Sequence, residues 1–220
     1  MWIDWLGYIG LIVKGAWITV ELTVWGCAVA LVSAFIAGIA RLSRSAGIRW
    51  LATIYIEFFR GTSFFVQMFW AYFVLPLLGI PLTPMEAGVL ALGLNVGAYG
   101  AEVVRGAIQA VPRGQIDACV ALNFTRFHRF RYIILPQALV TMLPTFGNNA
   151  IELLKGTAIV SLISLPDLTF QAQIVRAQTG NTAVPFIAVL IFYYLISLVI
   201  GHIVRNLEKR LSVGLDISKG

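Results

Sequence analysis

Uninterrupted apolar stretches constrain this chain more than any other feature. Nineteen uncharged residues separate Glu21 from Arg41, and 28 separate Arg176 from Arg205. Of the 220 residues, 59% are hydrophobic and 12% are charged, whereas soluble domains carry about 25% charged residues. An apolar helix of about 20 residues crosses a bilayer, and in lipid the backbone must satisfy its own hydrogen bonds. The sequence therefore predicts an all-α, multi-pass membrane protein.

Five membrane-spanning helices fit within the chain. We expect them between Glu21 and Arg41, over 51–78, over 84–111, from Pro136 to about Ser164, and between Arg176 and Arg205. Gly93, Gly97 and Gly100 form a stripe of small residues suited to close helix packing. In the loop 163–184, Ser164–Asp167 has the pattern of a capping box and Gly180 that of a helix stop, which predicts a short additional helix.

Basic residues set the expected orientation. They gather in the loops 41–49 and 112–132 and in the C-terminal tail, whereas the opposite face has only Lys14 and Arg176. The gathered residues are Arg41, Arg44, Arg49, Arg113, Arg126, Arg129, Arg131, Arg205, Lys209, Arg210 and Lys219. Because basic loops stay in the cytoplasm, we expect the N-terminus outside and the C-terminus inside. The net charge of +6 then reflects membrane topology and not nucleic-acid binding.

The basic loop 112–136 contains the pattern of a short amphipathic helix. Pro112 suits a helix start, Asn123 can end a helix in the left-handed conformation, and Thr125 can cap a following basic helix. Its apolar edge consists of Ile116, Val120 and Leu122. Such a helix either rests on lipid headgroups or binds a partner protein outside the membrane.

Three pairs of opposite charges lie three residues apart within the expected spans. They are Glu57 and Arg60, Glu102 and Arg105, and Glu152 and Lys155. Residues at this spacing are neighbours on a helix, and ionisable groups within a membrane are costly. The first two pairs are therefore either locally neutralised structural pairs or an inner gate that exchanges partners between helices.

The third and fourth spans carry polar side chains that suit a small zwitterion. Such a solute needs a few fixed donors, acceptors and opposite charges in a mostly apolar site. The alternative is a helix that merely lines a wet pore. The candidates for a substrate pathway are Asn95, Tyr99, Asn148, Asn149, Glu152, Lys155 and Thr157.

Several of these segments resemble one family. The loop is similar to the EAA loop of ABC importer permeases, Glu-Ala-Ala-x3-Gly-x9-Ile-x-Leu-Pro, and Gln115 lies two residues before it. The matching positions are Asp117, Ala118, Cys119, Asn123, Ile133, Leu135 and Pro136. Asp117, Cys119 and Asn123 depart from Glu, Ala and Gly in that pattern. The segments 57–62, 97–106, 135–138, 154–157 and 160–163 resemble the polar amino acid subfamily. The segments 121–123, 151–156 and 167–170 most resemble ectoine and hydroxyectoine permeases.

The resemblance implies a single permease domain over 1–220 with a type I, MetI-like architecture and a coupling loop at 112–136. It implies a bacterial inner-membrane protein that forms half of a pore for a polar amino acid or a similar compatible solute. Its expected partners are two ATPase subunits, a second permease (identical or related), an extracytoplasmic solute-binding protein and lipid. The chain contains no Gly-x4-Gly-Lys-Ser/Thr phosphate loop. ATP and Mg²⁺ would therefore bind to the partner ATPases, with no cofactor or metal in this chain.

Two other classes of function remain as alternatives. A self-sufficient secondary transporter or channel would often show inverted repeats, and none is obvious here. A membrane enzyme would need a metal-ligand cluster or a nucleophile with a base, and the two histidines, His128 and His202, lie far apart in sequence. We therefore expect a transport subunit that is not an enzyme.

Overall fold

The computed structural model describes the backbone of residues 2–212 and the side chains of residues 8–212. All regular elements in this range are helical. They are α1 (Trp2–Ala40), α2 (Ala46–Gly61), α3 (Phe64–Phe69), α4 (Pro84–Gln109), α5 (Arg113–Ala121), α6 (Arg126–Arg129), α7 (Leu135–Val160), α8 (Leu168–Thr179) and α9 (Ala183–Ser212). Short 3-10 or π turns follow α3, join α6 to α7, and follow α7: Trp70–Val74, Leu75–Leu78, Phe130–Ile134 and Ser161–Ile163. Lys219 and the ends of the expected domain lie outside the described residues.

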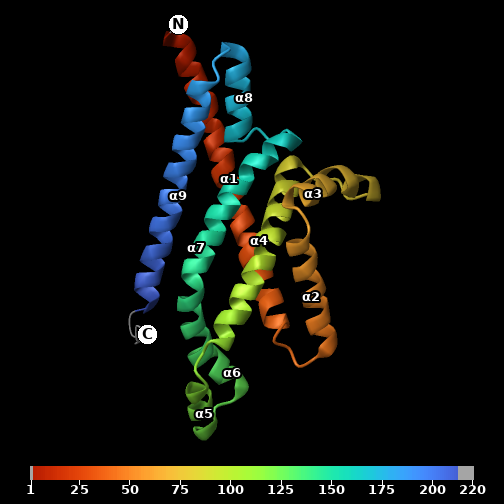
Figure 1. Ribbon diagram of the computed structural model, residues 1–220, viewed down its shortest axis with the longest axis vertical. Helices are drawn as coiled ribbons and strands as arrows, with labels where there is room; N and C mark the ends of the chain where they lie inside the picture. Colours follow the sequence, from red (N-terminus) through yellow and green to blue (C-terminus); the bar gives the residue numbers. More distant parts are fainter. Residues whose placement is uncertain (1, 213–220) are drawn as a thin grey trace.

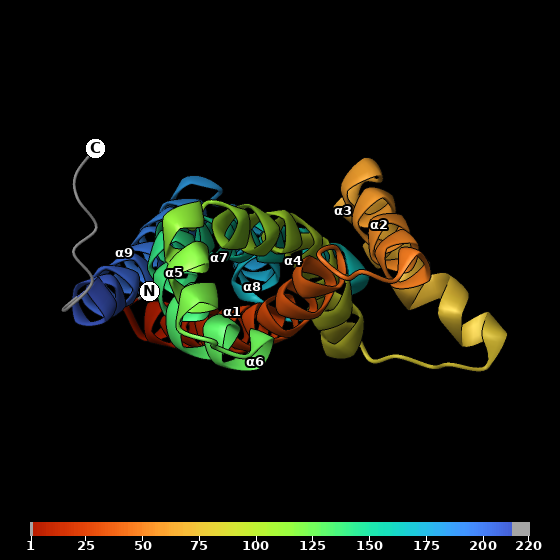
Figure 2. The ribbon, with the colours of Figure 1, turned by 90° about the horizontal axis from the view of Figure 1, so that it is seen from below.

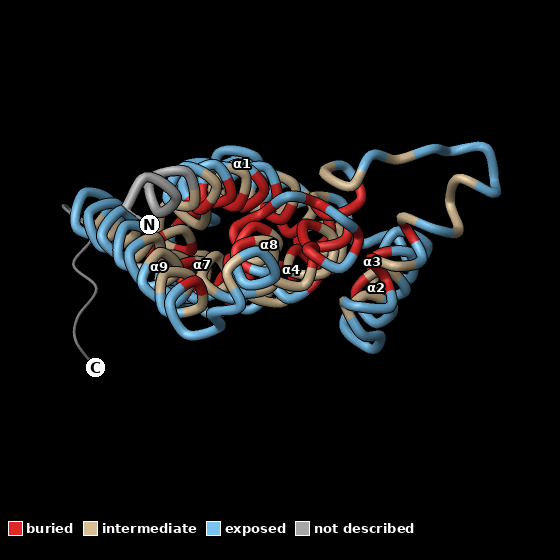
Figure 3. The backbone as a smooth tube through the Cα atoms, turned by 90° about the horizontal axis from the view of Figure 1, so that it is seen from above, coloured by how far each residue is buried: buried red, intermediate tan, exposed pale blue. Residues whose placement is uncertain are grey.

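The long helices α1, α4 and α7 form the centre of the molecule, and α9 runs along α7 (Figure 1). The short helices α5 and α6 lie at one end, and α8 lies at the other (Figure 1). Seen from below, α2 and α3 stand away from the central helices (Figure 2). Burial is concentrated where α1, α4, α7 and α8 face one another, while α9 and the α2–α3 arm are largely exposed (Figure 3).

Three helices of the described chain are long and apolar enough to cross a membrane: Tyr8–Ala40, α4 and α9. Two bent helix pairs raise the number to five if each pair is one span. These pairs are Ala46–Gly61 with Phe64–Leu78, and Arg126–Ile163 with Leu168–Thr179. The count is consistent with the five spans expected from the sequence.

The first helix is longer than predicted. It begins at Trp2 and continues past Lys14 and Glu21 to Ala40, so the boundary expected at Glu21 is wrong. Both charged side chains are exposed, so neither interrupts the packed face of the helix. At 39 residues, α1 is about 58 Å long, well beyond the ~30 Å hydrocarbon core.

The second expected span is not one continuous helix. The chain breaks after Gly61 and turns by 105° between α2 and the following segment. The side chain of Gln67 donates to the backbone oxygens of Phe59 and Thr62, at 2.9 and 3.2 Å, and to the Thr62 hydroxyl. Asn95 of α4 also donates to the Phe59 oxygen, at 2.8 Å. These amides replace helical bonds that the break removes, which is how a broken helix is tolerated inside a membrane protein.

The glycine stripe of α4 packs against α1 as predicted. A Cβ atom on Gly93 would lie 2.6 Å from Cβ of Val29, and one on Gly100 would lie 2.8 Å from Cβ of Ala34. A Cβ on Gly97 would overlap the Ser33 hydroxyl. The two helices are therefore as close as the absence of these side chains allows.

The short helix expected in the loop 163–184 is present as α8, but it begins later than predicted. Asp167 is its N-cap, with the Phe170 N–H donating to Oδ1 at 2.9 Å. Ser164, predicted as the cap, has a left-handed φ of 64° and ends the preceding turn. Gly180 ends α8 with φ 65°, as predicted.

Candidate functional site

The segment predicted to couple the chain to a partner forms a compact turn at one end of the molecule. Pro112 precedes α5, and Asn123 follows it with a left-handed φ of 55°. The Phe124 N–H then donates to the Cys119 oxygen at 2.9 Å, a bond typical of a helix C-terminus with a left-handed residue. Thr125 caps α6 by accepting from the His128 N–H at 3.3 Å. The conformations predicted for Asn123 and Thr125 are confirmed.

The outer surface of α5, together with Leu122 after it and Phe127 of α6, is exposed and partly apolar. Cys119 is buried, whereas Gln115, Asp117 and Ala118 are exposed. Val120, Leu122 and Phe127 are 58%, 68% and 70% exposed. Ile133, Leu135 and Pro136 are half-buried where the chain enters α7. Small residues beside large exposed apolar ones form a surface of the kind that binds a protein partner or a membrane.

A charge cluster lies where the ends of α1, α2 and α4 meet. Arg105 donates to Oε2 of Glu102 from Nη2 at 2.6 Å and from Nε at 2.8 Å. Nε of Arg41 lies 3.5 Å from Oε1 of the same carboxylate, and Nη1 of Arg41 donates to the Thr53 hydroxyl on α2. One carboxylate thus connects α1 to α4, and Arg41 connects both to α2.

The predicted pair of Glu57 and Arg60 does not form. Glu57 is exposed and has no ion-pair partner within the described part of the chain. Arg60 instead lies over the ring of Tyr99 on α4, 5.3 Å from its centroid, and is close enough to Glu102 to interact electrostatically. The spacing along α2 allowed a local pair, but packing beside α4 offers Arg60 an aromatic face.

Polar side chains of α4 and α7 converge on one cavity of about 340 Å³. Asn95 and Tyr99 line it from α4, and Asn149 and Glu152 line it from α7. Nδ2 of Asn149 is buried and has no hydrogen-bond partner among the described residues. Glu152 is paired with Lys155 at 2.7 Å, and both side chains are more than half exposed. The cavity therefore offers a free donor, a carboxylate and an aromatic ring.

Three of the predicted pathway residues do not line this cavity. Asn148 and Lys155 are exposed outside it. Thr157 is fully buried, donates to the Leu154 oxygen at 2.7 Å and shares a hydrogen bond of 2.9 Å with Tyr193 on α9. Thr157 therefore lies on the side of α7 that faces α9, away from this cavity.

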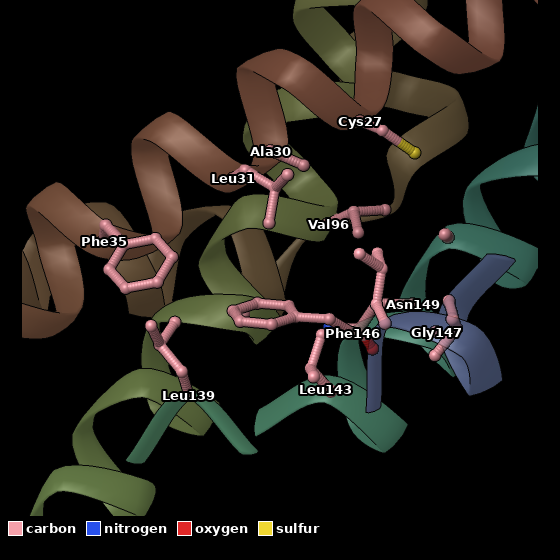
Figure 4. A pocket seen from close by; sticks show the side chains of 14 residues that line it. Cys27, Ala30, Leu31, Phe35, Val96, Leu139, Leu143, Phe146, Gly147 and Asn149 are labelled. Carbon is pink, nitrogen blue, oxygen red and sulfur yellow. The ribbon is translucent and has the colours of Figure 1, made fainter. Parts of the chain in front are cut away.

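A second cavity, of about 250 Å³ and almost entirely apolar, shares two lining residues with the first (Figure 4). Leu31 and Phe35 of α1 and Leu143 and Phe146 of α7 line it, and Asn149 lies at its edge (Figure 4). Val96 and Asn149 line both cavities, so the two cavities adjoin each other at these residues.

The position of Arg41 in this site was not predicted. Arg41 directly follows the first apolar stretch and was counted only as a loop residue for orientation. Gln67 was also missed, although a glutamine within an apolar segment is a signal of a buried polar contact. Both act between elements, which spacing along one helix does not reveal.

Comparisons with known proteins agree on one family. Residues 30–213 match the family model described as "Binding-protein-dependent transport system inner membrane component". The chain is 44% identical to a probable amino-acid ABC transporter permease protein, y4tF, of Sinorhizobium fredii, over 93% of this chain and 89% of that protein. It is 37% identical to the glutamine transport system permease protein GlnP of Escherichia coli K12, over 93% of this chain and 94% of that protein.

Solved structures show the same fold. A chain from a crystal structure of an amino acid ABC transporter with histidines has a TM-score of 0.86 and 34% identity, covering 96% of this chain and 98% of that one. A chain of the MetNI methionine ABC transporter, in an inward-facing conformation, has a TM-score of 0.77 and 20% identity, covering 92% of this chain and 97% of that one. The second likeness shows the fold alone, and it confirms the predicted MetI-like architecture.

Proposed function

The chain belongs to the family of inner-membrane components of binding-protein-dependent transport systems, and we propose that it is the permease subunit of an importer for a polar amino acid. Membership of a transport family confirms the prediction that the chain is not an enzyme. It also disfavours the alternative of a self-sufficient secondary transporter. The curated relatives named above are amino-acid and glutamine permeases, which supports the solute class.

The proposed importer contains two ATPase subunits, a second permease and an extracytoplasmic solute-binding protein. The exposed surface of α5, with Ala118 and Val120, is the proposed ATPase contact. Exposed apolar side chains in a helix at the end of the molecule support that assignment. The N-terminus is proposed to lie outside and the C-terminus in the cytoplasm, because the basic loops and α5 occupy one end.

The convergence of Asn95, Tyr99, Asn149 and Glu152 on one cavity carries the proposal for the solute pathway. An amino acid presents an ammonium and a carboxylate. Glu152 is the natural contact for the ammonium, once it exchanges Lys155 for the solute. The unpartnered amide of Asn149 is a donor for the carboxylate, and Arg60 over Tyr99 supplies a nearby positive charge. A solute in this cavity would lie between α4 and α7.

Uptake by the complex reconstituted with its ATPase and binding protein tests the pathway. Glu152→Gln and Asn149→Ala should each raise the apparent KM about tenfold, the effect of losing one charge-assisted hydrogen bond. The matched control is Thr141→Ala on the same helix; among the described residues its hydroxyl bonds only to the Gln137 backbone oxygen, at 3.2 Å. Unchanged KM in both pathway variants, at equal expression and with unchanged affinity of the binding protein, would place the pathway in the other permease.

The narrower resemblance to ectoine and hydroxyectoine permeases is a separate proposal about the solute. It rests on the segments 121–123, 151–156 and 167–170. Competition by unlabelled ectoine and by unlabelled glutamine against uptake in the same reconstituted system distinguishes the two. Competition by glutamine alone would exclude the ectoine assignment and leave the proposed amino-acid permease intact.

A further inference from the structure

One carboxyl group outside the sites described above is completely buried. Asp167 lies in the turn before α8, at the opposite end of the molecule from α5 (Figure 1). Its Oδ1 accepts the N-cap hydrogen bond from the Phe170 N–H. Its Oδ2 is buried and has no hydrogen-bond partner in the described chain. An ionised carboxylate with one bare oxygen in such a place is costly.

The Asp167 carboxyl lies beside a group of hydroxyls that come from four helices. Thr19 of α1 accepts from the Leu168 N–H at 3.1 Å. Thr157 of α7 shares its hydrogen bond with Tyr193 of α9. The Thr169 hydroxyl lies near both the Asp167 carboxyl and the Tyr193 hydroxyl. Hydroxyls can donate or accept, so they are suitable partners for either the acid or its anion.

The start of α8 packs closely against α1. A Cβ on Gly15 of α1 would lie 2.8 Å from both the backbone oxygen of Asp167 and Cα of Leu168. Leu168, Ala172 and Val175 of α8 are buried in a cluster with Ile12 and Ala16 of α1. Such packing leaves little room for a hydrated cation beside the carboxyl.

No cation of the described chain pairs with Asp167. The titratable group that faces it is Tyr193 of α9. The other charged side chains on the outer halves of the helices packed against α8, and on α8 itself, are exposed. These are Lys14 and Glu21 of α1, Glu152 and Lys155 of α7, and Arg176 of α8. Within the described residues, no cation therefore balances a buried negative charge on Asp167.

We propose that Asp167 is a proton-binding site, and that its neutral carboxylic acid fastens α8 to α1, α7 and α9. Protonation removes the uncompensated charge and converts Oδ2 into a donor toward the neighbouring hydroxyls. The Oδ1 cap of α8 is retained in both forms. This inference goes beyond the proposed function. Only the effect of protonation on transport rests on the proposed function, in which α8 lies at the end where a binding protein would dock.

The titration range follows from burial, which raises the pKa of Asp167 from 3.8 to about 6. The docked state of α8 thus binds the proton more tightly than a state in which Asp167 meets water. Docking is strongest at acidic pH, weakens as the pH rises towards 6, and changes little above it. Between pH 5 and pH 7 the opening equilibrium of α8 should increase about tenfold.

Infrared difference spectra of the full complex in lipid nanodiscs test the protonation. The carbonyl band of a protonated carboxylic acid should disappear with a midpoint near pH 6, matching the raised pKa, and should be missing from Asp167→Asn. Asparagine keeps the N-cap and supplies an uncharged donor, so the variant should fold. Glu21→Gln removes an exposed carboxyl of α1 and should keep the band. A spectrum without this band at pH 5 in the wild-type chain would overturn the proposal.

Hydrogen exchange of the α8 amides tests the fastening. After correction for the intrinsic rate, protection in the wild type should fall about tenfold between pH 5 and pH 7, and in Asp167→Asn it should not change. Equal pH dependence in both chains would refute the inference, as would protection that depends on sodium at fixed pH. Neither measurement uses transport, so failure of the proposed function would not affect the result.

Discussion

At the scale of single residues, Glu102 is a carboxylate around which three arginines gather, from α2, α4 and the end of α1. Its two oxygens meet Arg105 and Arg41, and Arg60 lies within electrostatic range. Three guanidinium groups thus share one carboxylate. Such an imbalance favours exchange of partners when the helices move, because a guanidinium released from Glu102 needs another acceptor. Glu57, exposed on α2 and without an ion pair among the described residues, is a nearby candidate.

Arg105→Ala tests whether this cluster holds the inner half of the pore closed. Fully buried pairs cost about 3–5 kcal/mol to break and exposed ones about 0–1 kcal/mol. The side chains of Arg105 and Glu102 are 33% and 22% exposed, so we expect a loss of about 1–2 kcal/mol in thermal unfolding. Basal ATPase activity of the reconstituted complex should become less dependent on the binding protein.

The control for Arg105→Ala is Lys155→Ala, which breaks a pair of the same spacing whose side chains are 63% and 68% exposed. Its effect on unfolding should stay below about 1 kcal/mol. If Arg105→Ala folds and keeps wild-type dependence on the binding protein, the cluster is structural and not a gate.

Local spacing predicted three charge pairs, of which two form and the pair of Glu57 and Arg60 does not. Glu102 with Arg105 and Glu152 with Lys155 follow from helix geometry, because residues three apart are neighbours. Thr157 and Arg60 could not be placed in this way, since their partners Tyr193 and Tyr99 lie on other helices. Polar side chains on both helices were enough to propose that α4 and α7 line one cavity, but not to predict which of these residues line it.

At the scale of elements, the closeness of α1 and α4 depends on glycine. Gly93→Ala would place a methyl group 2.6 Å from Cβ of Val29, an atom attached directly to the backbone of α1. Overpacking of this kind costs about 1–3 kcal/mol. We expect the variant to unfold at lower temperature in detergent, with reduced transport at equal expression.

Gly106→Ala on the same helix is the matched control for Gly93→Ala, because nothing lies within 4 Å of its added Cβ. Alanine favours a helix over glycine by up to about 1 kcal/mol, so this variant should be as stable as the wild type or more so. Equal destabilisation by both substitutions would mean that contact with α1 does not decide the effect.

Element boundaries were less predictable than element number. The break between α2 and α3 coincides with Gly61, Thr62 and Ser63, a cluster that signals a turn. One continuous span was nevertheless predicted, because the residues on both sides of this turn signal are apolar. The long N-terminal part of α1 was missed because Lys14 and Glu21 were read as the limit of an apolar segment. Tertiary contacts with α8 support that part instead.

At the scale of the whole molecule, the two ends differ in kind. The end with α5 and α6 carries Arg113, Arg126, Arg129 and Arg131, whereas the end with α8 is joined by buried hydroxyls. The predicted orientation places the first end in the cytoplasm.

Single cysteines at exposed Gly114 and Asn181, in a chain with Cys27 and Cys119 replaced by alanine, test this placement. A membrane-impermeant maleimide applied to spheroplasts should label Asn181→Cys and not Gly114→Cys, and the reverse pattern would invert the topology.

In the proposed importer, coupling between the two ends depends on a contact between α5 and an ATPase subunit. Ala118 is small and exposed, beside the exposed apolar side chain of Val120. Ala118→Arg adds bulk and charge to this surface without entering the core, so the chain should insert normally while the ATPase no longer co-purifies and transport is lost. Gly114→Ala alters the same helix where nothing lies within 4 Å, and it should keep both the ATPase and transport. Because Cys119 is buried, misfolding of α5 can be recognised separately. In a chain that keeps its native cysteines, a thiol reagent should label Cys119 only if α5 has misfolded. Retention of the ATPase and of full transport in a folded Ala118→Arg variant would remove α5 as the coupling element and favour the alternative of a helix resting on lipid headgroups.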